Sequence, residues 1–210
     1  MIISPDSCAR FFTYRNIINY IWHFIHDQFM LMSHNEKIKS DFEGTIIDVE
    51  SIGLFCRNYP DEDSMQYSKI IPTILGYITK DELKILCANG KSALNELQKE
   101  TLKILPSLKK PLYAFQCRFE RGAFYHCYDY TLKIDGELNA DAYEWKGDAC
   151  AKLGIPNYGD PFNNSGKECM LAWLRGDYEN AIKHNRSCLL KERDILLKRG
   201  YRKPDKLRMR

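Results

Sequence analysis

The sequence predicts an α/β fold built around one main domain, and three observations support this. Short β-branched and apolar runs, typical of buried strands, alternate with segments whose apolar residues recur at helical spacing. A chain of 210 residues is long enough to bury a sizeable core. Charged residues make up 28% of the sequence and aromatic residues 12%. That composition is ordinary for a globular protein and excludes a disordered or low-complexity chain.

The N-terminal segment is predicted to be an extension of the main domain. Residues 11–32 are mostly apolar and aromatic, but Arg15, His23 and Asp27 interrupt them. An Asp near the middle of a membrane span is costly, so we expect an amphipathic helix and no membrane span. The helix would pack on the main domain, on a partner protein or on a second copy of the chain. Residues 33–41 are polar and predict a linker, which gives an extension over 1–40 and a main domain over 41–210.

The main domain is predicted to alternate strands and helices. The helix that begins at Asp141 has a capping residue at its start and Gly154 after its end. Strands are predicted at 45–49, 70–79, 82–87 and 111–115, and helices at 91–105, 141–153, 168–174 and 178–199.

The first of these strands carries the strongest functional signal. Asp48 and Glu50 are two residues apart, so both side chains point to the same face of the sheet. Two carboxylates on one face of a buried strand repel each other unless a cation lies between them. Hard divalent cations such as Mg²⁺ take oxygen ligands of this kind. The pattern therefore predicts a metal site; the alternative is that both side chains lie on the exposed face of a half-buried strand.

Two motifs resemble those of the DEDD 3′-5′ exonucleases, a family of the RNase H-like superfamily. The run Ile47-Asp48-Val49-Glu50-Ser51-Ile52-Gly53-Leu54 is similar to the first motif, with Ser where the family has Thr. The run Gln116-Cys117-Arg118-Phe119-Glu120 is similar to the second motif, with Gln and Glu where the family has Asn and Asp. The alternative for Glu120 is the exposed start of a helix, where its charge suits the helix dipole. The resemblance implies an RNase H-like mixed sheet flanked by helices.

The third motif departs from the family pattern. The last predicted helix contains His184, but the positions at which the family has Asp hold Cys188 and Leu189. On a helical wheel Glu192 falls on the apolar arc, one turn beyond Cys188. Glu192 is therefore a candidate fourth carboxylate, and the alternative is a salt bridge to a basic neighbour. His184, at the edge of that arc, is a candidate for orienting a water molecule.

The resemblance implies a metal-dependent exonuclease that hydrolyses phosphodiester bonds of DNA or RNA from the 3′ end. In that family two divalent ions, Mg²⁺ or Mn²⁺, activate water and stabilise the leaving oxygen. Asp48, Glu50 and Glu120 would be metal ligands, with Glu192 as the fourth and His184 assisting catalysis. The alternative is that the fold persists without catalysis, because of Cys188, and binds nucleic acid or a partner protein.

A basic C-terminus supports a nucleic-acid partner. Residues 198–210 include seven basic residues and one acidic residue. Such a tail can follow a phosphate backbone, although basic termini are also common as solvated ends. We expect contacts to a single-stranded 3′ end from six residues: Gln116, Arg118, Lys198, Arg199, Arg202 and Lys203.

Eight cysteines are scattered along the chain, and none forms a Cys-x-x-Cys pair. No secretory signal opens the sequence. Together these features predict reduced, mostly buried thiols and a cytoplasmic location. The lack of paired spacing and of a His cluster argues against a zinc site.

Overall fold

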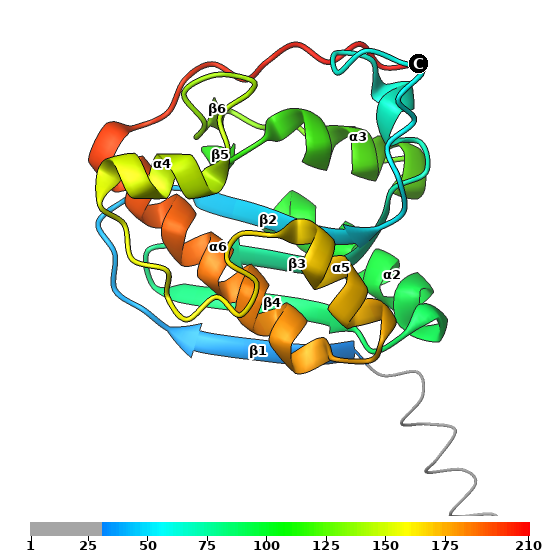
Figure 1. Ribbon diagram of the computed structural model, residues 1–210, viewed down its shortest axis with the longest axis horizontal. Coiled ribbons are helices and arrows are strands. Elements are labelled where there is room, and N and C mark those ends of the chain that lie inside the picture. The colour runs from blue at the N-terminus through cyan, green and yellow to red at the C-terminus, as the bar shows by residue number, and fades with distance from the viewer. Residues whose placement is uncertain (1–30) are drawn as a thin grey trace, which may run out of the picture.

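A computed structural model describes residues 31–210 and shows a six-stranded mixed sheet flanked by five α-helices (Figure 1). The strand order across the sheet is β1-β4-β3-β2-β5-β6. The strands are β1 (Leu31–Lys37), β2 (Thr45–Ile52), β3 (Ile71–Ile78), β4 (Glu82–Ala88), β5 (Leu112–Ala114) and β6 (Gly136–Glu137). The helices are α2 (Leu94–Ile104), α3 (Cys117–Tyr128), α4 (Lys146–Leu153), α5 (Gly166–Leu174) and α6 (Tyr178–Arg199).

The sheet has an antiparallel part and a parallel part that meet at β2. Strands β1 and β4, β4 and β3, and β3 and β2 pair antiparallel, whereas β2 pairs parallel with β5 and β5 parallel with β6. The parallel pairs need crossover connections, and α2 and α3 provide them. Every residue of β2 except Ser51, and every residue of β3 except Ile71, is buried. The strand that carries Asp48 is therefore covered on both faces, as strands at the centre of an α/β sheet are.

Helices cover both faces of the sheet. Helices α4, α5 and α6 lie on the face turned towards the viewer in Figure 1, and α2 and α3 pack on the other side. The long helix α6 contacts β2, β3 and β4, and its buried residues Ala181, Leu189 and Ile195 belong to the main hydrophobic core. Because α6 crosses directly over β2, its buried face lies opposite the carboxylates of that strand.

Most predicted elements are confirmed. Strands β3, β4 and β5 lie where strands were predicted after the first one, and α6 has the predicted bounds. Gly154 ends α4 with a positive φ of 63°, a conformation that glycine adopts without strain. The start of that helix was predicted wrongly: α4 begins at Lys146, and Asp141 instead accepts a hydrogen bond from the Tyr143 N–H at 2.8 Å in the preceding turn.

The predicted linker is also wrong over much of its length, because residues Leu31–Lys37 form the edge strand β1. Burial alternates along this strand, but the residues after Met32 are all polar. The sequence therefore lacks the alternation of apolar and polar residues that indicates a strand. Its inward-facing Glu36 is held by Arg186 of α6, with nitrogen–oxygen distances of 2.5 and 2.8 Å. That charge pair satisfies a polar side chain where an apolar one is usually found. The helix predicted over 11–32 lies outside the described residues apart from its last two.

The seven cysteines in the described part of the chain are all free, and five of them are buried. This agrees with the reduced, mostly buried thiols expected from the sequence. Over residues 31–210 no helix combines the length and the apolar character needed to cross a membrane.

Candidate metal centre

Strand β2 and helix α6 meet closely at Asp48. The Asn185 side chain of α6 donates to Asp48 Oδ2 at 2.7 Å and to the Asp48 carbonyl at 3.3 Å. Gly76 of β3 is the register partner of Asp48, and a Cβ at Gly76 would lie 2.0 Å from Asn185 Oδ1. Only a residue without a side chain allows α6 to approach the sheet this closely. The glycine thus makes the contact between Asn185 and Asp48 geometrically possible.

Four carboxyl groups lie at this junction, and we call them the carboxylate cluster: Asp48, Glu50, Glu120 and Glu192. Their exposed fractions are 6%, 9%, 3% and 0%. Glu120 Oε2 has no hydrogen-bond partner among the residues described. A side-chain hydrogen bond links Asp48 and Glu192. Burial raises the pKa of Glu120 well above its usual value, and the charge of Asp48 raises it further. Buried carboxyl oxygens without partners are costly, which indicates a place built for a cation or a shared proton.

A lysine supplies the cation. Lys146, the first residue of α4, reaches into the cluster, and its ammonium lies 2.9 Å from Asp48 Oδ1 and 2.6 Å from Glu192 Oε1. The same ammonium lies 5.6 Å from the centre of the Phe115 ring. The expected alternative for Glu192, a salt bridge to a basic neighbour, is what the structure shows.

The pKa values in this group separate the charged from the neutral members. Burial lowers the pKa of Lys146, but the charge of Asp48 outweighs burial and raises this pKa well above the usual value. Burial raises the pKa of Asp48, but the charge of Lys146 and its hydrogen bond bring this pKa below the usual value. Burial raises the pKa of Glu192 well above the usual value in spite of Lys146. The charge of Lys146 thus favours the ionised form of Asp48, whereas burial favours the neutral form of Glu192.

A second group of side chains adjoins the carboxylate cluster, and we call it the thiol-histidine set: Glu50, Cys169, His184 and Cys188. Donor atoms of Glu50, Cys169 and His184 lie within 4.8 Å of one another, as do those of Glu50, Cys188 and Asp48. His184 Nε2 lies 3.5 Å from Glu50 Oε1 and 3.7 Å from Cys188 Sγ. The donors come from β2, α5 and α6, so a bound ion would join the sheet to both helices.

The other ring nitrogen of His184 is anchored. Nδ1 lies 2.7 Å from Asp160 Oδ1, and Asp160 Oδ2 accepts from the Lys191 ammonium at 2.8 Å. Asp160, His184 and Lys191 are all buried. A carboxylate that fixes one nitrogen of a histidine and leaves the other to face a cluster of donors is typical of metal sites in proteins.

The donor types in the two groups favour different ions. The thiol-histidine set offers one imidazole, two thiols and one carboxylate, and zinc prefers nitrogen and sulfur ligands. Three of these donors, from Glu50, Cys169 and His184, lie within 4.8 Å of one another, and Cys188 lies within that distance of Glu50 and Asp48. Mg²⁺ requires oxygen ligands, and the Lys146 ammonium occupies the space between two of the four available carboxyls. The donor types of the thiol-histidine set are therefore those of a zinc site, whereas Lys146 already pairs with two of the carboxyls that the resemblance assigns to a two-metal centre.

Burial and neighbouring charges shift the pKa values of the thiol-histidine set. Burial and the charge of Asp48 raise the pKa of Glu50 to about 7, against the opposing charge of His184. Burial lowers the pKa of His184, but Glu50, Cys188 and Asp160 together raise it to about 11. Burial raises the pKa of the Cys169 thiol. Ion binding would therefore release protons from the ligands, as it does at zinc sites generally.

The residues predicted to contact nucleic acid fall into two groups. Arg118, Arg199 and Arg202 make internal contacts: Arg118 donates to the Lys206 carbonyl, Arg199 pairs with Glu144 at 2.5 Å, and Arg202 pairs with Asp205 at 2.8 Å and Glu137 at 3.3 Å. Gln116, Lys198 and Lys203 are exposed, and within residues 31–210 neither lysine forms an ion pair. Much of the basic charge of the tail therefore holds the tail against the domain.

The turn before Lys146 exposes two large aromatic side chains, Tyr143 at 81% and Trp145 at 76%. Between them Glu144 is held by Arg199 near the end of α6, and Lys198 is the neighbour of that arginine. Exposed aromatic rings on a basic surface are typical of sites on which unpaired bases stack.

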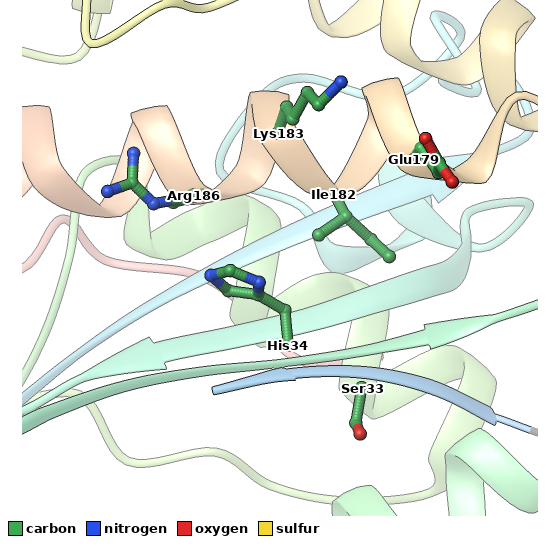
Figure 2. Close-up of a pocket in the computed structure, with 6 residues that line it drawn as sticks. All are labelled: Ser33, His34, Glu179, Ile182, Lys183 and Arg186. Atoms are coloured by element: carbon green, nitrogen blue, oxygen red, sulfur yellow. The ribbon is translucent and has the colours of Figure 1, made fainter. Parts of the chain in front are cut away.

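A shallow hollow of about 260 Å³ lies between β1 and α6 (Figure 2). Figure 2 shows His34 pointing from β1 towards α6, whereas Ser33 points away from it. Arg186 lines the hollow but is already paired with Glu36. We assign this hollow no role.

Comparison of the chain with protein-family models, with curated proteins and with solved structures finds no match. The functional argument therefore depends on the geometry of the centre.

Several residues of the centre were not singled out in the sequence. Lys146 and Asp160 are far along the chain from their partners. Cys188 was treated only as a missing carboxylate. A signal for the thiol-histidine set was present, because His184 and Cys188 are one helical turn apart and so share a face of α6.

Proposed function

We propose that this chain is an RNase H-like module that binds nucleic acid and does not hydrolyse it by the two-metal mechanism. The observation that carries the proposal is the Lys146 ammonium, paired with Asp48 at 2.9 Å and with Glu192 at 2.6 Å. An ammonium neutralises carboxylates, but it cannot present a metal-bound water for attack on phosphorus.

The RNase H-like assignment is supported by the way the three motif regions converge. The first motif lies on β2, the second at the start of α3 and the third on α6. The charges of Asp48 and Lys146 both act on the pKa of Glu120, so the second motif lies beside the first. A mixed sheet flanked by helices is also the architecture that the resemblance implies.

Zinc is the ion that we propose for the centre. Asp160 would hold the His184 ring in place, while Glu50, Cys169, His184 and Cys188 would provide the four ligands. When bound, zinc would supply a structural cross-link between β2, α5 and α6. Four protein ligands leave no open position for a reacting water, which agrees with a structural role.

Nucleic-acid binding is supported by the exposed pair Tyr143 and Trp145, whose turn is held through Glu144 by Arg199, the sequence neighbour of the exposed Lys198. Aromatic rings stack on bases irrespective of sequence, and lysines contact the backbone phosphates. This combination favours a single-stranded partner, whose bases are accessible to the rings.

The test uses the full chain with end-labelled single-stranded DNA and RNA. We expect saturable binding by fluorescence anisotropy that weakens with salt, and intact oligonucleotide after incubation with Mg²⁺ or Mn²⁺. Trp145→Ala should weaken binding by about tenfold or more, since a stacked base contributes about 1–3 kcal/mol. Leu174→Ala, at an exposed position on α5, is the matched control. Absence of binding to both DNA and RNA would refute the proposal.

The second candidate is the metal-dependent 3′-5′ exonuclease. The buried position of Glu192 beside Asp48 favours it, because four carboxyls then gather at one centre. That activity requires Lys146 to leave the cluster. Stepwise shortening from the 3′ end, abolished by Asp48→Ala, would establish this candidate in place of the first.

A further inference from the structure

Residues 143–146, which we call the aromatic segment, reverse the usual distribution of side chains between surface and interior. The aromatic residues Tyr143 and Trp145 are 81% and 76% exposed. The charged side chains that alternate with them, Glu144 and Lys146, are only 4% and 17% exposed. Folding normally buries large rings and leaves lysine and glutamate in water. Because the rings bury little area, the contacts of the two charged side chains must hold the segment in place.

We propose that Lys146 is a positioning residue for the nucleic-acid site: its ammonium, held by Asp48 and Glu192, fixes the aromatic segment with both rings facing outward. The inference rests on the proposed function, since it gives the carboxylate cluster the task of holding a surface on which bases stack. In this role Lys146 contacts neither a base nor a phosphate.

The anchor of Lys146 belongs to two regular elements of the fold. Its ammonium lies 2.9 Å from Asp48 Oδ1 on β2 and 2.6 Å from Glu192 Oε1 on α6. Asn185 of α6 in turn donates to Asp48 Oδ2 at 2.7 Å. A buried ion pair is costly to break, because separation leaves a charge without a partner away from water. The lysine is therefore fixed to the centre of the sheet, and Trp145 directly precedes it in the chain.

A second contact holds the other side of Trp145. Arg199 donates to Glu144 Oε1 at 2.9 Å, and Glu144 Oε2 accepts from the Ala140 N–H at 2.7 Å. Trp145 itself has an extended backbone, with φ −84° and ψ 141°. Successive side chains of an extended backbone point in opposite directions. With Glu144 and Lys146 both directed inward, the Trp145 ring between them faces outward.

Loss of this anchor would leave both rings exposed but free to move. Oligonucleotide affinity would then fall, because binding must order the segment, although every group that contacts the oligonucleotide is still present. A lysine that contacts phosphate behaves differently, since its removal also reduces the dependence of binding on salt. The salt dependence therefore distinguishes a positioning lysine from a phosphate contact.

The first measurement uses the free chain labelled with 5-fluorotryptophan. The sequence has three tryptophans, and the ¹⁹F signal of Trp145 is identified by its loss in Trp145→Phe. Lys146→Met keeps the aliphatic stem and removes the ammonium, and Lys152→Met, at an exposed lysine on the same helix, is the matched control. We expect the Trp145 signal to move towards that of the free amino acid and to narrow in Lys146→Met. It should keep its wild-type position in Lys152→Met.

A double variant, Asp48→Asn with Lys146→Met, separates positioning from stability. It removes both charges of the pair, so no buried charge is left without a partner, and the stability lost in Lys146→Met should largely return. Denaturant unfolding measures this recovery. The Trp145 signal of the double variant should nevertheless resemble that of Lys146→Met, because the anchor is still missing.

The second measurement is the affinity for end-labelled single-stranded DNA and RNA, by fluorescence anisotropy at several salt concentrations. We expect the single and the double variant to bind about fivefold to tenfold more weakly than the wild-type chain. The slope of the logarithm of the binding constant against that of the salt concentration should not change. A slope reduced by about 0.7 in Lys146→Met would show that this lysine contacts phosphate, and would overturn the inference.

Three further results would also overturn it. They are a Trp145 signal at its wild-type position in a folded variant, a double variant that regains affinity together with stability, and a double variant that does not fold. The last would show that the whole fold, and not the aromatic segment alone, depends on the pair. If the wild-type chain binds neither DNA nor RNA, the proposed function fails, whereas the ¹⁹F signal still decides whether Lys146 holds the aromatic segment.

Discussion

His184 Nδ1 lies 2.7 Å from Asp160 Oδ1, and both side chains are buried. The hydrogen bond fixes the imidazole ring, so that Nε2 faces Glu50 and Cys188. Asp160 is in turn paired with the buried Lys191. Asp160, a loop residue, and Lys191, about two turns after His184 on α6, thus fix the orientation of the histidine ring in the thiol-histidine set.

The first prediction concerns metal content. The purified chain should contain about one zinc per molecule, or take up one Co²⁺ with a thiolate-to-cobalt absorption band, since both ions accept sulfur ligands. Cys169→Ser and Cys188→Ser should each remove most of the bound metal, measured by mass spectrometry of the metal. Cys127→Ser, a half-buried cysteine on α3, should retain it. Equal metal content in all three variants would show that the ion lies elsewhere.

The second prediction concerns Asp160 as a positioning residue. Asp160→Asn keeps the size of the side chain but removes the charge that orients His184. Because such partners commonly change metal affinity by about 10–100-fold, we expect the zinc affinity to fall by that amount. Competition with a chelator measures the affinity directly. A fall in stability with unchanged zinc affinity would show that Asp160 serves folding only.

The sequence predicts those residues of the centre that belong to a pattern within one strand or helix, and misses those whose partners are far away in the sequence. Asp48 and Glu50 were found because period-two alternation is a local property of a strand. The helical wheel placed Glu192 on the apolar arc of α6, and its complete burial confirms that placement. Lys146 was missed because its partner Asp48 is 98 residues away, and no local pattern marks a lysine that will be buried. A solvated surface is the usual position of a lysine.

The same reasoning accounts for the errors at the edges of the fold. The strand β1 has few apolar residues, and its place in the sheet depends on pairing with β4 and on the contact between Glu36 and Arg186. Arg199 and Arg202 read as a basic tail in the sequence, but Glu144, Glu137 and Asp205 bind them in the structure. Charge partners brought together by tertiary structure are not visible in a window of sequence.

The third prediction concerns the close approach of α6 to the sheet. Gly76→Ala places a methyl group against Asn185 Oδ1 and Leu189 Cδ1, at 2.0 and 2.9 Å in the present backbone. Helix α6 must then move away from β3, and we expect a loss of about 1–3 kcal/mol in the free energy of unfolding, as for other overpacked sites. Denaturant unfolding measures it. Gly166→Ala, at the first residue of α5 with nothing within 4 Å, is the control and should be close to neutral.

The fourth prediction concerns pH. The hydrogen bond and charge of Arg199 hold the pKa of Glu144 below its usual value of 4.5. A carboxyl whose pKa is lower in the folded than in the unfolded state stabilises the fold above the unfolded pKa. That contribution is lost as the pH falls through the folded pKa. The difference in unfolding free energy between the wild-type chain and Glu144→Gln should therefore be constant from pH 7 to about 5 and shrink below pH 4.5.

Glu144→Gln also tests whether the contact with Arg199 positions the turn that carries Tyr143 and Trp145 for oligonucleotide binding. If the Arg199 contact holds this turn in its binding position, oligonucleotide affinity should fall together with the stability difference as the pH is lowered. Glu168→Gln, at an exposed acidic residue in the first turn of α5, is the matched control for the loss of one negative charge. Equal oligonucleotide affinities of Glu144→Gln and the wild-type chain at pH 7 would show that the two aromatic rings do not depend on Arg199 for their position.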